Sequence, residues 1–68
     1  MNRYVVMPED GRWFEVEATT AEMAYRGCSS YVMPSTRTAI LDPNTKHVEV
    51  YTRRLDRHGN LIAVNREV

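Results

Sequence analysis

The chain has 68 residues, with nine basic and nine acidic side chains, a formal net charge of zero and one cysteine. A single domain of this length buries only about 60% of its unfolded surface, and its core supplies roughly 3–5 kcal/mol of net stability. Zero net charge provides no overall field to attract nucleic acid or an anionic membrane, and one cysteine excludes an intrachain disulfide. We expect one small globular domain over residues 1–68. We expect it in the cytoplasm, because the apolar run near the N-terminus, residues 4–7, is too short for a signal or membrane segment.

The first predicted element is a β-hairpin. Two runs rich in β-branched and aromatic residues, 3–7 and 12–18, flank the turn-like segment Pro8-Glu9-Asp10-Gly11. Loops of two or four residues give the same alternation of side chains. The better core face then consists of Val5, Met7, Phe14 and Val16. The opposite face consists of Tyr4, Val6 and Trp13 together with Glu15 and Glu17.

One stretch, about residues 20–32, has the pattern of a helix. Thr19 and Glu22 have the spacing of a capping box, which predicts the start of the helix. Pro34 disfavours helical geometry at the residue before it, which predicts the end near residue 32. Residues three and four positions apart form a small, flat apolar face of Ala21, Ala24, Gly27, Cys28, Tyr31 and Val32. We expect this face to cover a sheet and Cys28 to be a buried, unreactive thiol.

A second hairpin is predicted after the helix. Runs 35–41 and 47–55 flank a segment that starts with Asp42-Pro43, which is typical of a type I turn. We prefer a five-residue loop, which places Ile40 beside Val48 on the core face. A four-residue loop instead places Ala39 and Leu41 on the face of Val48 and Val50.

A third hairpin ends the chain. The segment Asp56-Arg57-His58-Gly59 predicts a turn in which Gly59 takes the left-handed conformation. A strand over 60–64 then pairs with the preceding strand, with Leu61 opposite Leu55 and Val64 opposite Thr52. Residues 65–68 are expected to form a frayed tail.

The element order β-β-α-β-β-β predicts an α+β domain, with one helix packed on one face of an antiparallel or mixed sheet of four to five strands. A single helix about 10–12 Å wide cannot cover both faces of such a sheet. The apolar residues that we place on the open face and the C-terminal hairpin are Tyr4, Trp13, Tyr51, Leu55 and Leu61. Such a patch indicates self-association or contact with another protein. The alternative is that Leu55 and Leu61 close a minor second core.

The sequence has no pattern that supports catalysis, a metal ion or a cofactor. His47 and His58 lie on different elements, and neither Cys-x-x-Cys nor His-x-x-x-His spacing occurs. The acidic residues of the strands alternate with apolar ones, as on a solvated strand face, and nothing indicates a pocket that would raise a carboxyl pKa. We therefore expect a protein that is not an enzyme.

Basic residues concentrate in the second half of the chain. Residues 1–34 carry three basic and five acidic side chains, whereas residues 35–68 carry six and four. The residues that could contact nucleic acid at the C-terminal hairpin are Arg53, Arg54, Arg57 and His58. The competing interpretation pairs these arginines with Glu49, Asp56 and Glu67 in an exposed lattice of little energy.

Two functional hypotheses remain. The preferred one is a protein–protein interaction module, forming a homodimer or binding another protein through the open sheet face and the C-terminal hairpin. The alternative is a small nucleic-acid-binding accessory protein that uses the hairpin over 53–57. Neither hypothesis requires a membrane, a metal ion or a cofactor.

Overall fold

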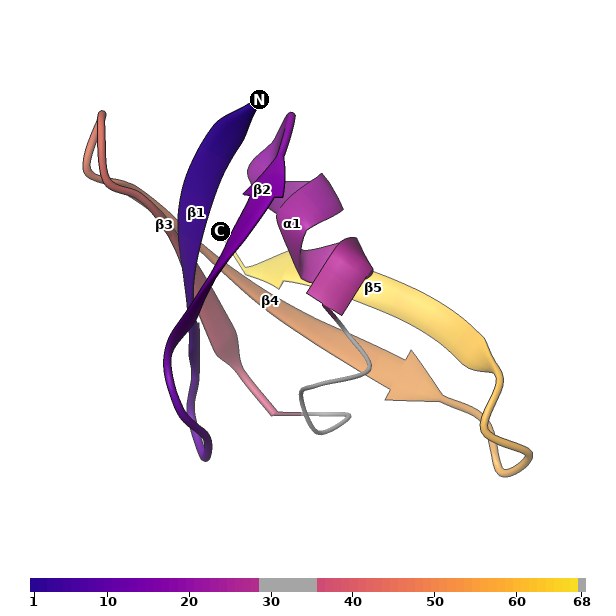
Figure 1. The fold of residues 1–68 in the computed structure, drawn as a ribbon. Coiled ribbons are helices and arrows are strands. Elements are labelled where there is room, and N and C mark those ends of the chain that lie inside the picture. Colours follow the sequence, from indigo (N-terminus) through magenta and orange to yellow (C-terminus); the bar gives the residue numbers. More distant parts are fainter. Residues whose placement is uncertain (29–35, 68) are drawn as a thin grey trace.

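A computed structural model describes residues 1–28 and 36–67. These residues form β1 (Asn2–Pro8), β2 (Phe14–Ala18), α1 (Ala21–Cys28), β3 (Thr38–Asp42), β4 (His47–Leu55) and β5 (Leu61–Glu67). The strands make one antiparallel sheet in the order β2-β1-β3-β4-β5, and α1 lies over one face of it (Figure 1). The predicted α+β class and element order are confirmed.

The connection through α1 explains how one helix reaches most of the sheet. Strands β2 and β3 both run antiparallel to β1, which lies between them, so β2 and β3 are parallel to each other. Antiparallel neighbours can be joined by short turns, whereas parallel strands need a crossover. The helix supplies that crossover and contacts β1, β2, β3 and β4. The far end of the β4–β5 hairpin extends beyond the helix (Figure 1).

The helix begins one residue later than a cap at Thr19 would require. The Thr20 hydroxyl accepts a hydrogen bond from the Met23 N–H at 3.1 Å, and the Thr20 carbonyl accepts one from the Ala24 N–H at 3.0 Å. Thr20 is therefore the N-cap, and the predicted capping box on Thr19 is wrong. The predicted helical residues 29–32 and the stop at Pro34 lie outside the described residues.

This cap gives a direct test of the helix start. We expect Thr20→Ala to lower the free energy of unfolding by about 1 kcal/mol, because it removes the acceptor of an otherwise unpaired helix N–H. Thr19→Ala is the matched control, and it should change stability by less than half as much. Urea unfolding followed by circular dichroism measures both. Equal losses for the two variants would contradict the assignment of Thr20 as the N-cap.

In the first hairpin, the side chains of β1 alternate between the two sheet faces in the opposite sense from the prediction. Val6 lies opposite Phe14, and Tyr4 lies opposite Val16, so these four side chains share a face. Seven residues, 7–13, lie between the paired residues Val6 and Phe14. A loop of two or four residues would put an even number of residues between any two paired positions. A slip of one residue moves every side chain of a strand to the other face. The prediction that Val5 and Met7 face the core is therefore wrong.

The second hairpin has the register of the shorter loop. Leu41 lies opposite Val48, so the preferred pairing of Ile40 with Val48 is wrong. The Asp42 carbonyl accepts a hydrogen bond from the Lys46 N–H at 2.8 Å, and Lys46 has a positive φ of 64°. This geometry closes the connection within residues 43–46 and leaves Val48 on the face away from the helix.

The third hairpin follows the predicted turn but differs beyond it. Gly59 has a φ of 84° and donates to the Asp56 carbonyl at 3.0 Å, as expected for a type I turn with a left-handed glycine. The pairing of Leu55 with Leu61 is also confirmed.

A β-bulge changes the register of the rest of this hairpin. The register shifts between Arg54 and Leu55, so Val64 lies opposite Arg53 rather than Thr52. Strand β5 then continues to Glu67. Residues 65–67 are therefore paired strand rather than the expected frayed tail.

The main core lies between α1 and the sheet. Its buried members are Tyr4, Val6, Ala18, Ala24, Tyr25, Cys28, Ile40 and Tyr51. The rings of Tyr25 and Tyr51 stack with centroids 5.2 Å apart and an interplanar angle of 14°. Tyr25 was not expected on the buried face of the helix, whereas Gly27, which was expected there, is exposed. The buried face of α1 therefore includes Tyr25 and does not include Gly27.

Candidate interaction surface

The face of the sheet away from α1 carries a compact group of apolar side chains on three adjacent strands. One row runs across β1, β3 and β4 as Met7, Ala39 and Val50, and the next row runs as Val5, Leu41 and Val48. We call these six residues the open-face patch. Five of them are half-buried, and Val48 is 47% exposed. The patch is therefore continuous both across the three strands and along each of them.

The sequence contained a signal for this patch that does not depend on register. The runs Tyr4–Met7 and Ala39–Leu41 are apolar at consecutive positions, so each strand has apolar side chains on both faces. Strands of this kind are typical of sheets covered on both sides. Whichever face the helix covers, the other face of β1 and β3 is apolar as well.

Charged side chains border the open-face patch on both sides. Toward β2, Glu15 lies opposite Val5, and Arg3 pairs with Glu17 at 3.2 Å. Toward β5, Glu67 lies opposite Val50 and is held by Arg37 through two hydrogen bonds of 2.8 and 2.9 Å. Both ion pairs are exposed and contribute little to stability. An apolar centre with a polar rim is the usual composition of a protein interface.

The predicted surface residues divide into two groups. Tyr4 and Tyr51 are buried beneath α1, so the expectation that they lie on the open face is wrong. Trp13 is exposed immediately before β2. Leu55 is half-buried and Leu61 is 51% exposed, both at the end of the β4–β5 hairpin.

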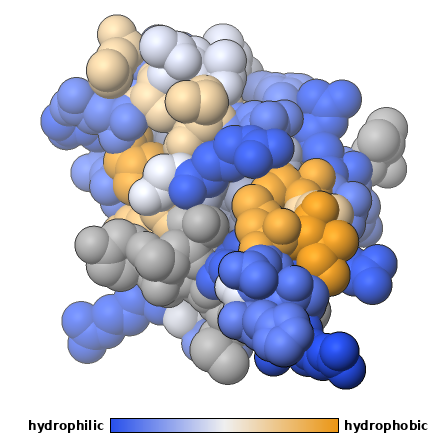
Figure 2. All heavy atoms as spheres, turned by 90° about the vertical axis from the view of Figure 1, so that its right-hand side faces the viewer, coloured by the Kyte–Doolittle hydropathy of each residue, from blue (hydrophilic) through white to orange (hydrophobic). Residues whose placement is uncertain are grey.

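The β4–β5 hairpin carries a second, smaller apolar surface. Leu61 and its neighbour Ile62, which is 57% exposed, are consecutive large hydrophobic residues on β5. Figure 2 looks at the molecule from the side to which this hairpin extends and shows a compact hydrophobic patch surrounded by hydrophilic atoms. Within β5, Val64 is the residue that packs against the main core. The hairpin end is therefore an exposed projection from the main core.

The basic residues of the hairpin do not form one surface. Arg53 is half-buried on the helix side, whereas Arg54 is exposed on the opposite face, because successive strand residues point to opposite sides. Arg57 and His58 are exposed in the turn. A contiguous phosphate-binding patch of all four residues is thus not formed.

The predicted acidic partners of these arginines bind other groups. Glu67 pairs with Arg37, and Glu49 lies 3.6 Å from Arg66. The Asp56 carboxylate accepts hydrogen bonds from backbone N–H groups of its own turn at 2.8 and 2.9 Å, and these bonds lower the pKa of Asp56. Asp56 is therefore a turn-stabilising residue.

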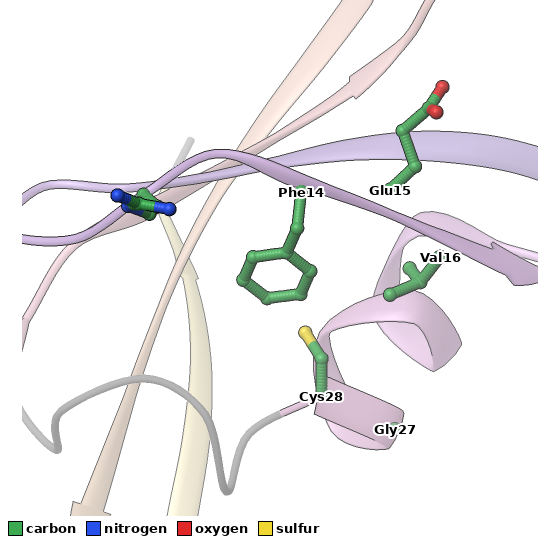
Figure 3. A pocket seen from close by; sticks show the side chains of 6 residues that line it. Phe14, Glu15, Val16, Gly27 and Cys28 are labelled. Atoms are coloured by element: carbon green, nitrogen blue, oxygen red, sulfur yellow. The ribbon is translucent and has the colours of Figure 1, made fainter.

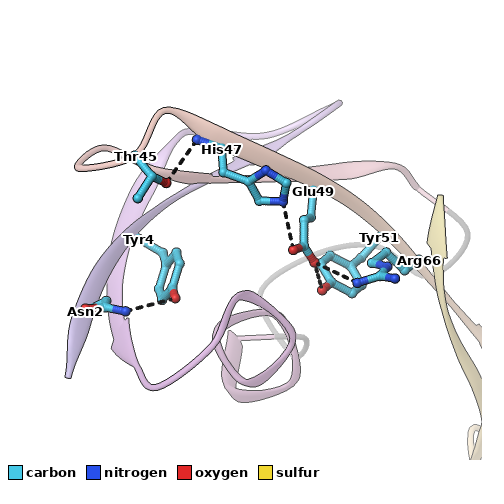
Figure 4. A network of polar contacts seen from close by, with 7 residues as sticks. All are labelled: Asn2, Tyr4, Thr45, His47, Glu49, Tyr51 and Arg66. Carbon is cyan, nitrogen blue, oxygen red and sulfur yellow. Dashed lines mark hydrogen bonds and ion pairs between the residues drawn. The ribbon is translucent and has the colours of Figure 1, made fainter. Parts of the chain in front are cut away.

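Glu49 is the centre of a polar network beside the helix (Figure 4). It accepts a hydrogen bond from the Tyr51 hydroxyl at 2.5 Å and contacts His47 Nε2 at 3.1 Å. The bond from Tyr51 is the largest cause that lowers the pKa of Glu49, and Arg66 acts in the same direction. Burial, followed by the bond to Glu49, raises the pKa of Tyr51. An ionised carboxylate with these partners ties β4 to β5 and does not act as a proton donor.

A hollow of about 420 Å³ lies between β2 and the end of α1 (Figure 3). Its lining among the described residues consists of Arg12, Phe14, Glu15, Val16, Gly27 and Cys28. Cys28 is 2% exposed, and its thiol donates a hydrogen bond to the Tyr25 carbonyl at 3.5 Å. Burial raises the pKa of Cys28, which keeps it a protonated thiol and therefore a poor nucleophile.

Within residues 1–28 and 36–67, no three His, Cys, Asp or Glu side chains gather in a way that could hold a metal ion. No helix there has the length and apolar character needed to cross a bilayer. Comparisons with protein-family models, curated proteins and solved structures find no match to this chain.

Proposed function

We propose that this protein is a non-enzymatic interaction module that self-associates through the open-face patch. The observation that carries the proposal is the pair of apolar rows on a sheet face that α1 does not cover. Contiguous apolar patches on small proteins usually mark interaction sites. Two sheets can pack such faces about 10 Å apart with their side chains interdigitated.

Size and charge favour a second copy as the partner. The molecule measures 38 × 22 × 21 Å, so a broad face offers on the order of 800 Å², which is what each partner contributes to a standard interface. A twofold axis brings the same patch of both copies together. Each copy has zero net charge, and its Arg3–Glu17 and Arg37–Glu67 pairs flank the patch on opposite sides. Two copies therefore meet without net repulsion.

The test is a change of charge within the patch. We expect Val48→Glu to halve the mass of the assembly in sedimentation equilibrium at micromolar concentration, because each interface would then bury two carboxylates. Val48→Lys should have the same effect, since the cost comes from burying charge of either sign. Circular dichroism checks that both variants remain folded.

Met23→Glu is the matched control. Met23 is 53% exposed in the first turn of α1, on the other side of the sheet, and its replacement removes a similar apolar surface and adds the same charge. This variant should keep the wild-type mass. A wild-type chain that sediments at 7.9 kDa, or folded Val48 variants of unchanged mass, would overturn the proposal.

A further inference from the structure

We infer that the outer edge of β5 is a second self-association surface, on which β5 of another copy pairs antiparallel to join two five-stranded sheets. This surface is distinct from the open-face patch. Strand β5 is at one edge of the sheet and has seven residues without glycine or proline. Its outward N–H and C=O groups form a template for another strand. The other edge strand, β2, is shorter and contacts α1.

The hairpin has few of the features that usually protect an edge. Its bulge lies at the start of β5, which leaves residues 63–67 in regular pairing with β4. The strand has no lysine, and Leu61 and Ile62 are exposed beside the bulge. A projecting two-stranded ribbon is only marginally stable in water. A second copy would pair with the regular part of this strand and extend the ribbon to four strands.

Symmetry restricts the register of this pairing. A twofold axis perpendicular to the sheet keeps each side chain on its own face, so the residue on the axis must lie opposite itself. The centre of the regular segment 63–67 is Asn65, which is exposed. This register places Arg66 opposite the partner's Val64, and Glu67 opposite the partner's Ala63. Like charges therefore do not face each other, as antiparallel pairing requires.

The two interfaces can operate in one assembly. Face-to-face packing needs a twofold axis parallel to the sheets, whereas edge pairing needs one perpendicular to them. Perpendicular twofold axes are the combination found in dihedral tetramers. If one interface is lost, the other still holds two copies together as a dimer. Loss of the open-face interface and loss of the β5-edge interface can therefore be measured separately.

The experiment uses a cysteine at the symmetry axis. We expect Asn65→Cys to form a disulfide-linked dimer under mild oxidation, because directly opposed Cβ atoms in an antiparallel pair lie about 4.5–5.5 Å apart. The reaction should be roughly a hundredfold faster than for Arg57→Cys, an exposed control in the turn of the same hairpin, because pairing raises the effective thiol concentration. Non-reducing electrophoresis measures both rates, and native Cys28 is too buried to react.

The same pair of variants in the Val48→Glu background separates the two surfaces. Fast cross-linking of Asn65→Cys in that background supports edge pairing that does not depend on the open face. A second check is Asn65→Lys, which places two like charges opposite each other and should halve the mass of the Val48→Glu assembly. Equal cross-linking rates for Asn65→Cys and Arg57→Cys, or an unchanged mass for Asn65→Lys, would overturn the inference.

Discussion

Replacement of Tyr25 by alanine is expected to leave about half of the protein unfolded at 25 °C. Tyr25 is fully buried between α1 and the sheet, and its ring stacks on that of Tyr51. Removing a buried aromatic ring costs about 3–5 kcal/mol, which equals the roughly 3–5 kcal/mol that a core of this size supplies. Thermal unfolding followed by circular dichroism should show a broad transition at low temperature.

Tyr25→Phe separates the ring from its hydroxyl. Burial raises the pKa of Tyr25, and the charge of Arg53 opposes this rise. The hydroxyl is therefore neutral at physiological pH, and its removal should cost much less stability than removal of the stacked ring. If Tyr25→Ala unfolds at the wild-type temperature, Tyr25 is not part of the core.

The sequence predicted those features that depend on local chemistry. Strand β4 spans His47–Leu55 as expected, and Gly59 adopts the left-handed conformation that its turn requires. Both follow from residues that are neighbours in the chain. The start of the helix was predicted to within one residue, with the cap at Thr19 instead of the observed Thr20.

The sequence did not predict which face of each strand is buried, and this changed the candidate site. Side-chain alternation depends on whether a loop has an odd or even number of residues, and Pro8-Glu9-Asp10-Gly11 is compatible with both. Because the observed register differs by one residue from the predicted one, Tyr4 lies in the core and Val5 does not. Val48 moved outward for the same reason. The open face was thus expected, but most of the residues on it were not.

Glu49→Gln is expected to lose much of the acid sensitivity of the wild type. The Tyr51 hydrogen bond, assisted by His47 and Arg66, lowers the pKa of Glu49 in the folded state. A carboxyl group with a depressed folded pKa stabilises the protein above its unfolded pKa of about 4.3, and this contribution is lost as pH falls through the folded pKa. Wild-type stability should therefore fall from about pH 5 downward.

Glutamine keeps an acceptor for the Tyr51 hydroxyl but has no charge for Arg66. At pH 7 the variant should lose roughly 1 kcal/mol, and the difference from wild type should shrink as pH decreases, because both side chains are then neutral. Urea unfolding between pH 3 and pH 7 measures this convergence. Glu9→Gln, the same chemical change at an exposed residue after β1, should run parallel to the wild type. A Glu49→Gln profile that also runs parallel to the wild type would show that the network does not couple folding to the charge of Glu49.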